Sequence, residues 1–393
     1  MEHLDSVRLL LAGLVFGLGL LGLFKAPLGF LWKPAVAATE WGHLLVFFPL
    51  FLLLLPGGAS ASGWVGLGLT ALAALLLLSS LGRALRYTKG LEERFAAAFG
   101  PVRLPALPGA PARPAPLVLS QLFSVSTPAV VPTRHLYREI EGRALHLDLY
   151  RSAEAPRSQP LVVVIHGGSW NSGDSTQLGW LNGYLAARGM AVAAINYRLA
   201  PHHVFPAQHE DVLAALGWLK ENASRLELDA SRIALLGRSA GGQLALLAAY
   251  TTRDPAIRAV VSLYAPSDLN WGWNNPTNPW VLDSPKTLSE YLGGTPAQVQ
   301  ERFDAASPID FVNPGSPPTL LLHGTRDELV FVEQSRRLAR RLKEANVPHV
   351  ELEFPWATHG CDANPAGPAG QITTWAVERF LAVAFHDAPA KAA

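Results

Sequence analysis

The amino-terminal fifth of the chain contains very few charged residues, and this feature most strongly limits the environment in which the chain can fold. Between Met1 and Leu81 the charged residues are Glu2, Asp5, Arg8, Lys25, Lys33 and Glu40. Three apolar runs lie in this stretch, at residues 7–24, 41–56 and 64–81. A helix that spans a bilayer needs about 20 apolar residues, with about 17 as a lower limit. The first and third runs are long enough and the second is slightly short, and we predict three transmembrane helices within residues 1–90.

Two other interpretations of this segment are weaker. A buried helical hairpin in a soluble protein is an alternative, but three successive apolar runs would leave it no polar face for water. A cleavable signal peptide is disfavoured because residues 1–6 are acidic rather than basic, and because two more apolar runs follow the first.

The basic residues predict an orientation. They follow the first and third runs: Lys25, Lys33, Arg83, Arg86 and Lys89. With three spans, the positive-inside rule places the amino terminus outside and the rest of the chain in the cytoplasm. With only two spans, this orientation would reverse.

Charge and cysteine content exclude several kinds of protein. The formal net charge is +1, from 32 basic and 31 acidic residues, which argues against a nucleic-acid partner because such proteins present a basic face. Cys361 is the single cysteine, so the chain can form neither an intrachain disulfide nor a cysteine-based metal site.

Residues 91–132 differ from both their neighbours. Residues 91–99 are typical of a short amphipathic helix, and residues 101–116 contain six prolines. Such a proline-rich stretch favours an extended, stiff conformation, so we predict a tether over 91–132. We expect the catalytic domain to cover residues 133–387.

The remaining chain alternates strand and helix patterns. Strands are predicted at residues 136–140, 144–150, 161–165, 191–196, 233–236, 259–264, 319–323 and 350–354. Helices are predicted at residues 207–222, 241–250, 331–345 and 372–385. This alternation predicts an α/β domain with a doubly wound, mostly parallel sheet, whose active site lies at the carboxyl ends of the strands.

The segment Gly237-Arg238-Ser239-Ala240-Gly241-Gly242 carries the strongest chemical signal. It follows a predicted strand and opens a predicted helix, which is the context of a nucleophile elbow. In such a turn the serine hydroxyl stands above the sheet, at the amino terminus of the helix. A glycine-rich turn with an incidental serine is the alternative, but this context favours Ser239 as a nucleophile.

A serine nucleophile needs a base and an orienting acid, which follow it in the chain in doubly wound hydrolases. His359 lies just after the last strand, and Asp327 just after the strand before it. Glu328 and Asp362 are competing acids by position. His323 is more consistent with a packing or supporting role than with catalysis.

The segment His166-Gly167-Gly168-Ser169-Trp170 follows another buried strand. Acyl transfer needs backbone N–H donors for the negatively charged oxygen of the tetrahedral intermediate. Glycines let these donors approach the substrate closely. We therefore expect Gly167, Gly168 and Ala240 to form the oxyanion hole.

Together with Tyr197-Arg198-Leu199-Ala200-Pro201, residues 205–207 and Asp211, these motifs resemble the hormone-sensitive-lipase-type carboxylesterases. The HGG-x-W, HG-x-x-D and THG blocks also resemble the bacterial BD-FAE hydrolases. The resemblance covers about residues 136–385. It implies an α/β-hydrolase fold and a carboxylic ester hydrolase that needs no cofactor.

The chain departs from this pattern in two places. Lipase-type members often have an acidic residue where Arg238 stands, so we expect Arg238 to alter the charge of the substrate pocket. The amino-terminal cap helices of many lipase-type members are expected to be absent, with the membrane segment and the tether in their place. The family's substrate preference therefore does not carry over.

The walls of the pocket are less constrained by the sequence. Trp170 follows the oxyanion glycines directly, and the insertion 267–307 holds Trp271, Trp273, Trp280 and Tyr291. These aromatic residues either line the pocket, as we expect for Trp271 and Trp273, or form a small core of the insertion. His202, His203 and His209 lack the carboxylate or cysteine spacing of a metal site, and no metal is expected.

These observations predict a membrane-anchored serine carboxylesterase or lipase that forms an acyl-enzyme on Ser239. The expected partners are a small-molecule or lipid ester and the bilayer, and the expected location is the bacterial inner membrane with the catalytic domain in the cytoplasm. An acyltransferase or peptidase that uses the same triad, and a non-catalytic ligand-binding protein of the same fold, remain alternatives.

Overall fold

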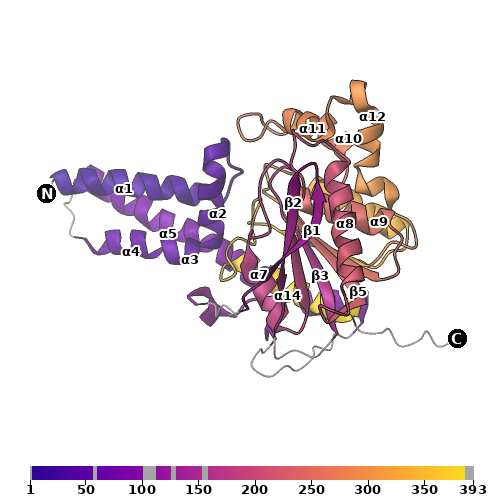
Figure 1. Ribbon diagram of the computed structural model, residues 1–393. Helices are drawn as coiled ribbons and strands as arrows, with labels where there is room; N and C mark the ends of the chain where they lie inside the picture. The colour runs from indigo at the N-terminus through magenta and orange to yellow at the C-terminus, as the bar shows by residue number, and fades with distance from the viewer. Residues whose placement is uncertain (1, 56–59, 101–111, 125–129, 153–157, 386–393) are drawn as a thin grey trace.

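The computed structural model describes residues 2–55, 60–100, 112–124, 130–152 and 158–385. Figure 1 shows two bodies: a bundle of apolar helices from the first ninety residues, and an α/β body from the rest of the chain. The bundle projects from one side of the α/β body, and the amino terminus lies at its remote end.

One sheet forms the centre of the α/β body. Its strands are β1 (Thr133–Ile140), β2 (Arg143–Tyr150), β3 (Gln159–Ile165), β4 (Ala191–Ile195), β5 (Leu228–Arg238), β6 (Ile257–Leu263), β7 (Thr319–Gly324) and β8 (His349–Phe354). Their order is β1-β2-β4-β3-β5-β6-β7-β8. The pairs β1–β2 and β2–β4 are antiparallel, and the other pairs are parallel. The prediction of a doubly wound, mostly parallel sheet is confirmed.

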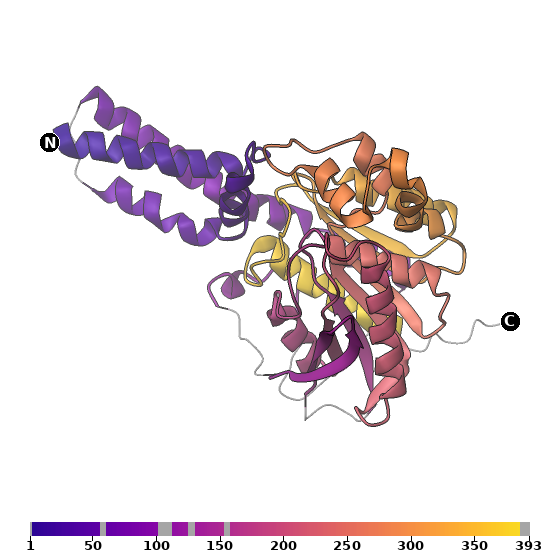
Figure 2. The ribbon, with the colours of Figure 1, turned by 45° about the horizontal axis from the view of Figure 1, so that its top comes forward.

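Helices cover both faces of this sheet (Figure 2). The helices of the α/β body are α7 (Gly179–Ala187), α8 (Ala207–Glu221), α9 (Ala240–Thr251), α10 (Leu269–Asn274), α11 (Ser284–Leu292), α12 (Pro296–Ala305), α13 (Glu333–Glu344) and α14 (Pro368–Phe385), with 3-10 turns η2 (Leu119–Leu122) and η3 (Pro308–Phe311). Alternate residues of β3 enter two cores: Val163 packs with α8 and α9, whereas Val164 packs with α7 and α14. A strand buried on both faces in this way needs a continuous apolar run, which β3 has.

The amino-terminal bundle contains α1 (Glu2–Leu21), η1 (Gly29–Leu31), α2 (Trp32–Glu40), α3 (Gly42–Leu45), α4 (Phe47–Leu54) and α5 (Ala61–Tyr87). In the views of Figures 1 and 2, α1, α4 and α5 lie side by side, and α2 and α3 lie at the end next to the α/β body. By length and composition, α1 and α5 can each cross a membrane.

The second predicted membrane helix, at residues 41–56, corresponds to α3 and α4, and a sharp bend at Trp41 precedes it. The chain is helical before and after Trp41, and the segments Gly29–Glu40 and Gly42–Leu54 meet at an angle of 77°. The backbone leaves the helical conformation at Trp41 (φ −115°, ψ 6°). Gly42 passes so close to α5 that an added Cβ would lie 2.3 Å from the carbonyl oxygen of Leu77. This bent pair counts as at most one broken span, so the described chain has two or three candidate spans.

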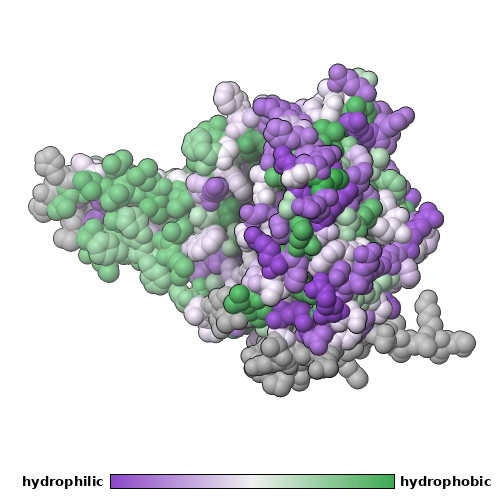
Figure 3. Space-filling view, viewed as in Figure 1, coloured by the Kyte–Doolittle hydropathy of each residue, from purple (hydrophilic) through white to green (hydrophobic). Residues whose placement is uncertain are grey.

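The bundle presents apolar side chains outward over most of its length (Figure 3). Large exposed residues include Leu10, Leu14, Phe47, Phe51, Leu54, Trp64 and Leu75. An exposed apolar surface of this extent is typical of a region that contacts a membrane or another protein.

The segment predicted as a tether differs from that prediction at both of its described ends. In α6 (Leu91–Phe99), the side chains of Leu91 and Phe95 are buried. Phe95 packs edge-on against Trp375 of α14, with 5.2 Å between ring centroids. Farther along, the buried Arg113 donates a hydrogen bond to Gln371 at 3.1 Å. Leu91 and Phe95 are buried because they form an apolar face of α6 that covers α14. Residues 101–111 of the predicted tether lie outside the described chain.

The burial of Phe95 predicts the effect of its removal. Phe95→Ala is expected to lower the free energy of unfolding by about 3 kcal/mol, because it leaves a cavity between α6 and α14. Chemical denaturation of the detergent-solubilised protein measures this loss. Glu93→Ala, on the exposed face of the same helix, is the control and should change stability by less than about 0.5 kcal/mol. Equal midpoints for the two variants would mean that α6 is a loose tether.

Candidate active site

Ser239 stands at the turn between β5 and α9, at the carboxyl end of the central strands. Its backbone has φ 53° and ψ −124°, a strained conformation for a residue with a side chain. The flanking glycines make the turn possible: an added Cβ on Gly237 would lie 2.1 Å from the carbonyl oxygen of Gly241, and one on Gly241 would lie 2.2 Å from that of His166. The local geometry is that of a nucleophile elbow.

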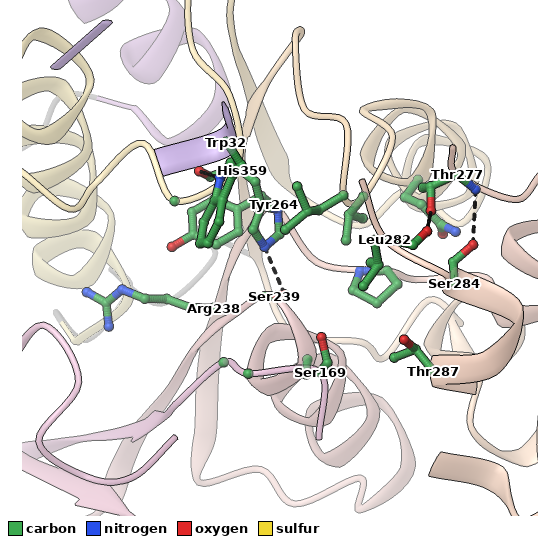
Figure 4. A pocket seen from close by; sticks show the side chains of 18 of the residues that line it. Trp32, Ser169, Arg238, Ser239, Tyr264, Thr277, Leu282, Ser284, Thr287 and His359 are labelled. Carbon is green, nitrogen blue, oxygen red and sulfur yellow. Dashed lines mark hydrogen bonds between the residues drawn. The ribbon is translucent and has the colours of Figure 1, made fainter. Parts of the chain in front are cut away.

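Three predicted side chains come together at this turn. The Ser239 hydroxyl donates a hydrogen bond to Nε2 of His359 over 3.0 Å, which Figure 4 shows as a dashed line. Nδ1 of His359 donates to Oδ2 of Asp327 over 2.7 Å. Because an ionised carboxylate only accepts hydrogen bonds, this contact places the imidazole proton on Nδ1 and leaves Nε2 free to take a proton from serine.

Asp327 is completely buried but well supplied with donors. Its Oδ1 accepts the backbone N–H groups of Leu329 and Val330, at 2.9 and 2.8 Å. Nε2 of His323 lies 3.2 Å from Oδ2, while Nδ1 of His323 contacts Ser335. Burial alone would raise the pKa of Asp327, but the charge interaction with His359 and the hydrogen bonds from both histidines outweigh it and hold the pKa below its ordinary value. Asp327 is therefore ionised at neutral pH.

The two competing acids are engaged elsewhere. Asp362 accepts hydrogen bonds from Arg238 and from the Tyr264 hydroxyl, both at 2.6 Å. Glu328 accepts a hydrogen bond from the Thr358 hydroxyl. Among the described acids, only Asp327 lies within hydrogen-bond distance of the His359 ring, so the geometry selects it as the orienting acid.

The Arg238 side chain differs from its prediction as a pocket charge. In Figure 4 its guanidinium points away from Ser239 and the cavity. It lies buried in an ion pair with Asp362, whose charge offsets its own. Arg238 borders the cavity, but its charge is paired with Asp362 and does not face the cavity.

The predicted oxyanion donors are not equivalent. The N–H of Gly167 donates to the side-chain oxygen of Gln177 over 2.8 Å, so in this conformation it is occupied. Within the described residues, the N–H groups of Gly168 and Ala240 have no hydrogen-bond partner. The N–H of Ser169, which was not predicted as an oxyanion donor, also has no hydrogen-bond partner within the described residues. All of these residues border the cavity beside Ser239.

A cavity of about 700 Å³ lies in front of Ser239 and His359, with a largely apolar lining. This volume is in the range of ligand pockets. Of the tryptophans considered above, Trp170 and Trp271 border it. Trp170 is largely committed to packing, because it stacks on Tyr291 at 4.1 Å and its Nε1 donates to Gln243 at 2.9 Å.

Two tryptophans of the insertion lie outside this cavity. Trp273 packs edge-on against Phe303, with 5.6 Å between centroids, so its prediction as a pocket residue is not supported. Trp280 is 77% exposed. The insertion therefore contributes one wall residue, Trp271, from this group and uses its other aromatic residues for packing or presents them at the surface.

The amino-terminal segment supplies another wall, which the sequence did not predict. Trp32, Lys33, Val36 and Trp41 border the same cavity. Nε1 of Trp32 donates to the backbone oxygen of His359 over 2.8 Å. In Figure 4 the Trp32 ring stands beside the His359 ring. Helix α2 and its end therefore form part of the cavity wall.

Cys361 lies close to His359 in sequence but is not a nucleophile. Its side chain is 1% exposed, and burial raises the pKa of its thiol well above the ordinary value. No cluster of three or more His, Cys, Asp or Glu side chains is placed to hold a metal ion within the part of the chain that the structure covers.

Glu328 predicts a pH dependence of stability. Burial raises its pKa from 4.5 to about 7, so between these values the unfolded state ionises while the folded state keeps the proton. Stability is therefore lost as the pH rises through this range. Glu328→Gln keeps an acceptor for Thr358, and it is expected to stabilise the protein on the order of 2 kcal/mol at pH 8 and little at pH 5.

Thermal unfolding at the two pH values measures this difference. Glu301→Gln, at an exposed position, is the control and should give the same small change at both pH values. An equal effect of Glu328→Gln at pH 5 and pH 8 would show that this carboxyl group titrates normally.

Comparison with known proteins identifies relatives of this chain. The BD-FAE family model matches residues 147–342, which include the oxyanion loop, Ser239 and Asp327. The chain is 31% identical over 347 residues to the probable carboxylic ester hydrolase LipM of Mycobacterium tuberculosis, covering 82% of this chain and 78% of LipM. That match must extend into the chain before Thr133, since the chain from Thr133 onward is shorter than the matched share.

Two further relatives, also from Mycobacterium tuberculosis, match over a shorter region. The esterase LipC is 33% identical over 251 residues, covering 60% of this chain and 61% of LipC. The esterase LipQ is 31% identical, covering 62% of this chain and 60% of LipQ. The chain therefore spans less than two thirds of the length of LipC and of LipQ.

Solved structures share the fold. The esterase LipW of Mycobacterium marinum superimposes with a TM-score of 0.58 at 25% identity, covering 77% of this chain and 90% of LipW. The thermostable carboxylesterase EstE1, cloned from a metagenomic library, gives a TM-score of 0.58 at 23% identity over 68% of this chain and 94% of EstE1. The second match supports the fold alone.

Proposed function

This chain belongs to the BD-FAE family of α/β-hydrolase carboxylesterases, and we propose that it is a membrane-anchored serine carboxylesterase that acts on lipophilic esters. The observation that carries this proposal is the continuous hydrogen-bonded path from Ser239 through His359 to the buried Asp327. This arrangement can remove a proton from serine and hold the resulting imidazolium, which is what ester cleavage by a serine requires.

Acylation begins when Ser239 Oγ attacks the ester carbonyl carbon and its proton passes to Nε2 of His359. The electron pair of the C=O double bond moves to oxygen, and the N–H groups of Gly168 and Ala240 donate to the resulting oxyanion, with Ser169 as a further donor. One such donor is worth about 3 kcal/mol in the transition state. Gly167 can join them only when Gln177 releases its N–H. Collapse then breaks the bond to the alcohol oxygen, which takes the proton from His359.

Deacylation repeats these steps with water. His359 takes a proton from the water as its oxygen attacks the acyl carbon, and then returns a proton to Ser239 Oγ as the acid leaves. Asp327 stays ionised throughout, holds the imidazole in the tautomer that exposes Nε2, and stabilises the imidazolium that forms in each step. The low pKa of Asp327 supports this role.

The membrane anchor is the second part of the proposal. It is supported by the apolar outer surface of the bundle and by two helices, α1 and α5, that are long enough to span. Figure 1 shows that the carboxyl ends of α1 and α5 lie next to the α/β body, and basic residues occur in or soon after these ends: Lys25, Lys33, Arg83, Arg86 and Lys89. By the positive-inside rule this end faces the cytoplasm, which places the catalytic domain there and the amino terminus outside.

The proposed chemistry is tested by hydrolysis of p-nitrophenyl esters from acetate to palmitate, using detergent-solubilised protein. Ser239→Ala is expected to lower kcat at least about 10⁴-fold and to abolish labelling by a fluorophosphonate probe, because the chain then lacks its nucleophile. Ser224→Ala, at an exposed position, is the control and should leave both unchanged. Undiminished turnover in Ser239→Ala would contradict the serine mechanism.

Two matched substitutions distinguish the acids near His359. Asp327→Asn is expected to lower kcat on the order of 10⁴-fold, because the imidazole loses the acceptor that fixes its tautomer. Asp362→Asn is expected to lower kcat far less and to reduce stability by about 3 kcal/mol, because it leaves the buried Arg238 guanidinium without its counter-charge. Ester kinetics and denaturation of both variants measure this. A loss of kcat that is equal in the two variants would contradict the assignment of Asp327.

A further inference from the structure

Helix α2, at the end of the bundle next to the α/β body, borders the active-site cavity. The segment that contains it meets the segment Gly42–Leu54 at 77°, and α4 lies alongside α1 and α5 in the bundle. If α1 and α5 cross the bilayer, α2 therefore runs nearly parallel to the bilayer surface, at the end of the bundle next to the α/β body. Amphipathic helices at this depth contact both lipid and protein.

Both ends of α2 are fixed to the chain that follows β8. At the start, Nε1 of Trp32 donates to the backbone oxygen of His359 over 2.8 Å. At the end, the buried Glu40 side chain accepts a hydrogen bond from the N–H of Ala369 at 2.9 Å. The backbone oxygen of Glu40 accepts one from the side-chain amide of Asn364 at 2.8 Å. These hydrogen bonds at both ends hold α2 in place as a wall of the site.

The side of α2 that faces the cavity is mainly apolar. Trp32, Val36 and Trp41 border the cavity from this helix and its end, and Trp271 and Phe331 border it from the α/β body. Lys33 also borders the cavity and is exposed, so the rim of the cavity lies along α2. A long hydrocarbon chain fits such a wall, whereas a short acyl group bound at Ser239 would not reach along it.

A loop of the α/β body meets the bundle at the same level. The N–H of Gly29 donates to the backbone oxygen of Trp280 over 2.8 Å, and the Asn278 side chain donates to the backbone oxygen of Pro27 over 3.2 Å. Beside this junction, the side chains of Trp280 and Phe30 are 77% and 74% exposed. Tryptophan side chains such as that of Trp280 are enriched at the boundary between membrane and water.

The loop that carries Trp280 also reaches the cavity. Thr277 and Leu282, on either side of Trp280, border it. One continuous set of residues therefore connects the level of the bilayer surface, through this loop and α2, to Ser239 and His359.

We propose that α2 is the acyl-binding wall of the active site, and that the substrate is a long-chain ester dissolved in the bilayer, which reaches Ser239 along α2 without passing through water. The inference rests on the proposed esterase function and adds its substrate class and route of access. The hydrocarbon chain lies against Trp32, Val36 and Trp41, and its far end remains in the bilayer while the ester group reaches the nucleophile.

Two tryptophan substitutions test the wall in detergent. Trp41→Ala is expected to lower kcat/KM for p-nitrophenyl dodecanoate about tenfold and to change that for the acetate less than twofold, because only the long chain reaches this side chain. Trp64→Ala, which removes an exposed tryptophan at the remote end of α5, is the matched control and should change neither. Equal values for Trp41→Ala and wild type on the dodecanoate, or equal losses on both esters, would overturn the assignment of α2 as the acyl wall.

The route of access is tested with the full-length protein in phosphatidylcholine vesicles. 4-Methylumbelliferyl palmitate is placed either in the same vesicles as the protein or in separate vesicles, and soluble 4-methylumbelliferyl acetate is the control. The palmitate is expected to be cleaved at least tenfold faster in the same vesicles, and the acetate equally fast in both arrangements. Equal rates for the palmitate, or cleavage of the acetate alone, would overturn this inference and leave the esterase function standing. Cleavage of neither ester, with Ser239 unlabelled by a fluorophosphonate, would instead contradict the proposed function.

Discussion

The 2.7 Å hydrogen bond between His359 and Asp327 depends on two loops that leave neighbouring parallel strands. The loop after β7 carries Asp327, and the loop after β8 carries His359. Backbone hydrogen bonds join the two loops: Thr325 donates to Phe354 at 3.0 Å, and Arg326 donates to Ala357 at 3.1 Å. The register of β7 and β8 thereby sets the distance between acid and base. Without this contact, the buried carboxylate would lose one of its donors and Ser239 would lose an oriented base.

The amino-terminal segment supports the same loops from the side of the membrane bundle. Trp32 binds the backbone of His359, and Arg326, next to the catalytic acid, donates to the backbone oxygen of Gly22. Arg83 of α5 donates to the same oxygen over 2.8 Å. The bundle is therefore built into the frame that holds the acid and the base. An anchor that only fixed the location of the enzyme would not need these contacts.

The elements that the sequence predicted well are those with a local signal. The buried strands appear as short β-branched or aliphatic runs, and each predicted strand forms with similar bounds; β5 differs most, because it begins at Leu228 rather than at residue 233. The glycine pattern around Ser239 predicts a nucleophile elbow only between a strand and a helix, and the sequence predicts both of these elements. The positions of Asp327 and His359 follow from strand order, so they were accessible without a structure.

The remaining features depend on contacts between distant parts of the chain. Trp32 lies 327 residues before His359, and nothing local in its sequence indicates that its indole binds there. The same is true of Arg238, which looks like a pocket charge until Asp362 is placed beside it, and of Gln177, which occupies the N–H of Gly167. Trp271 and Trp273 are two residues apart, yet only the first borders the cavity because the short helix α10 turns the second towards Phe303.

The central claim is that Ser239 carries the acyl group during turnover, with His359 and Asp327 as its proton relay. The most direct measurement is rapid mixing of the solubilised protein with p-nitrophenyl acetate, an acid quench within the first turnover, and mass spectrometry of the peptides. We expect an acetyl group on Ser239 in a near-stoichiometric amount, and complete loss of turnover once Ser239 is blocked by a fluorophosphonate. Turnover that persists with Ser239 fully blocked, or an acetyl group on a different residue, would contradict it.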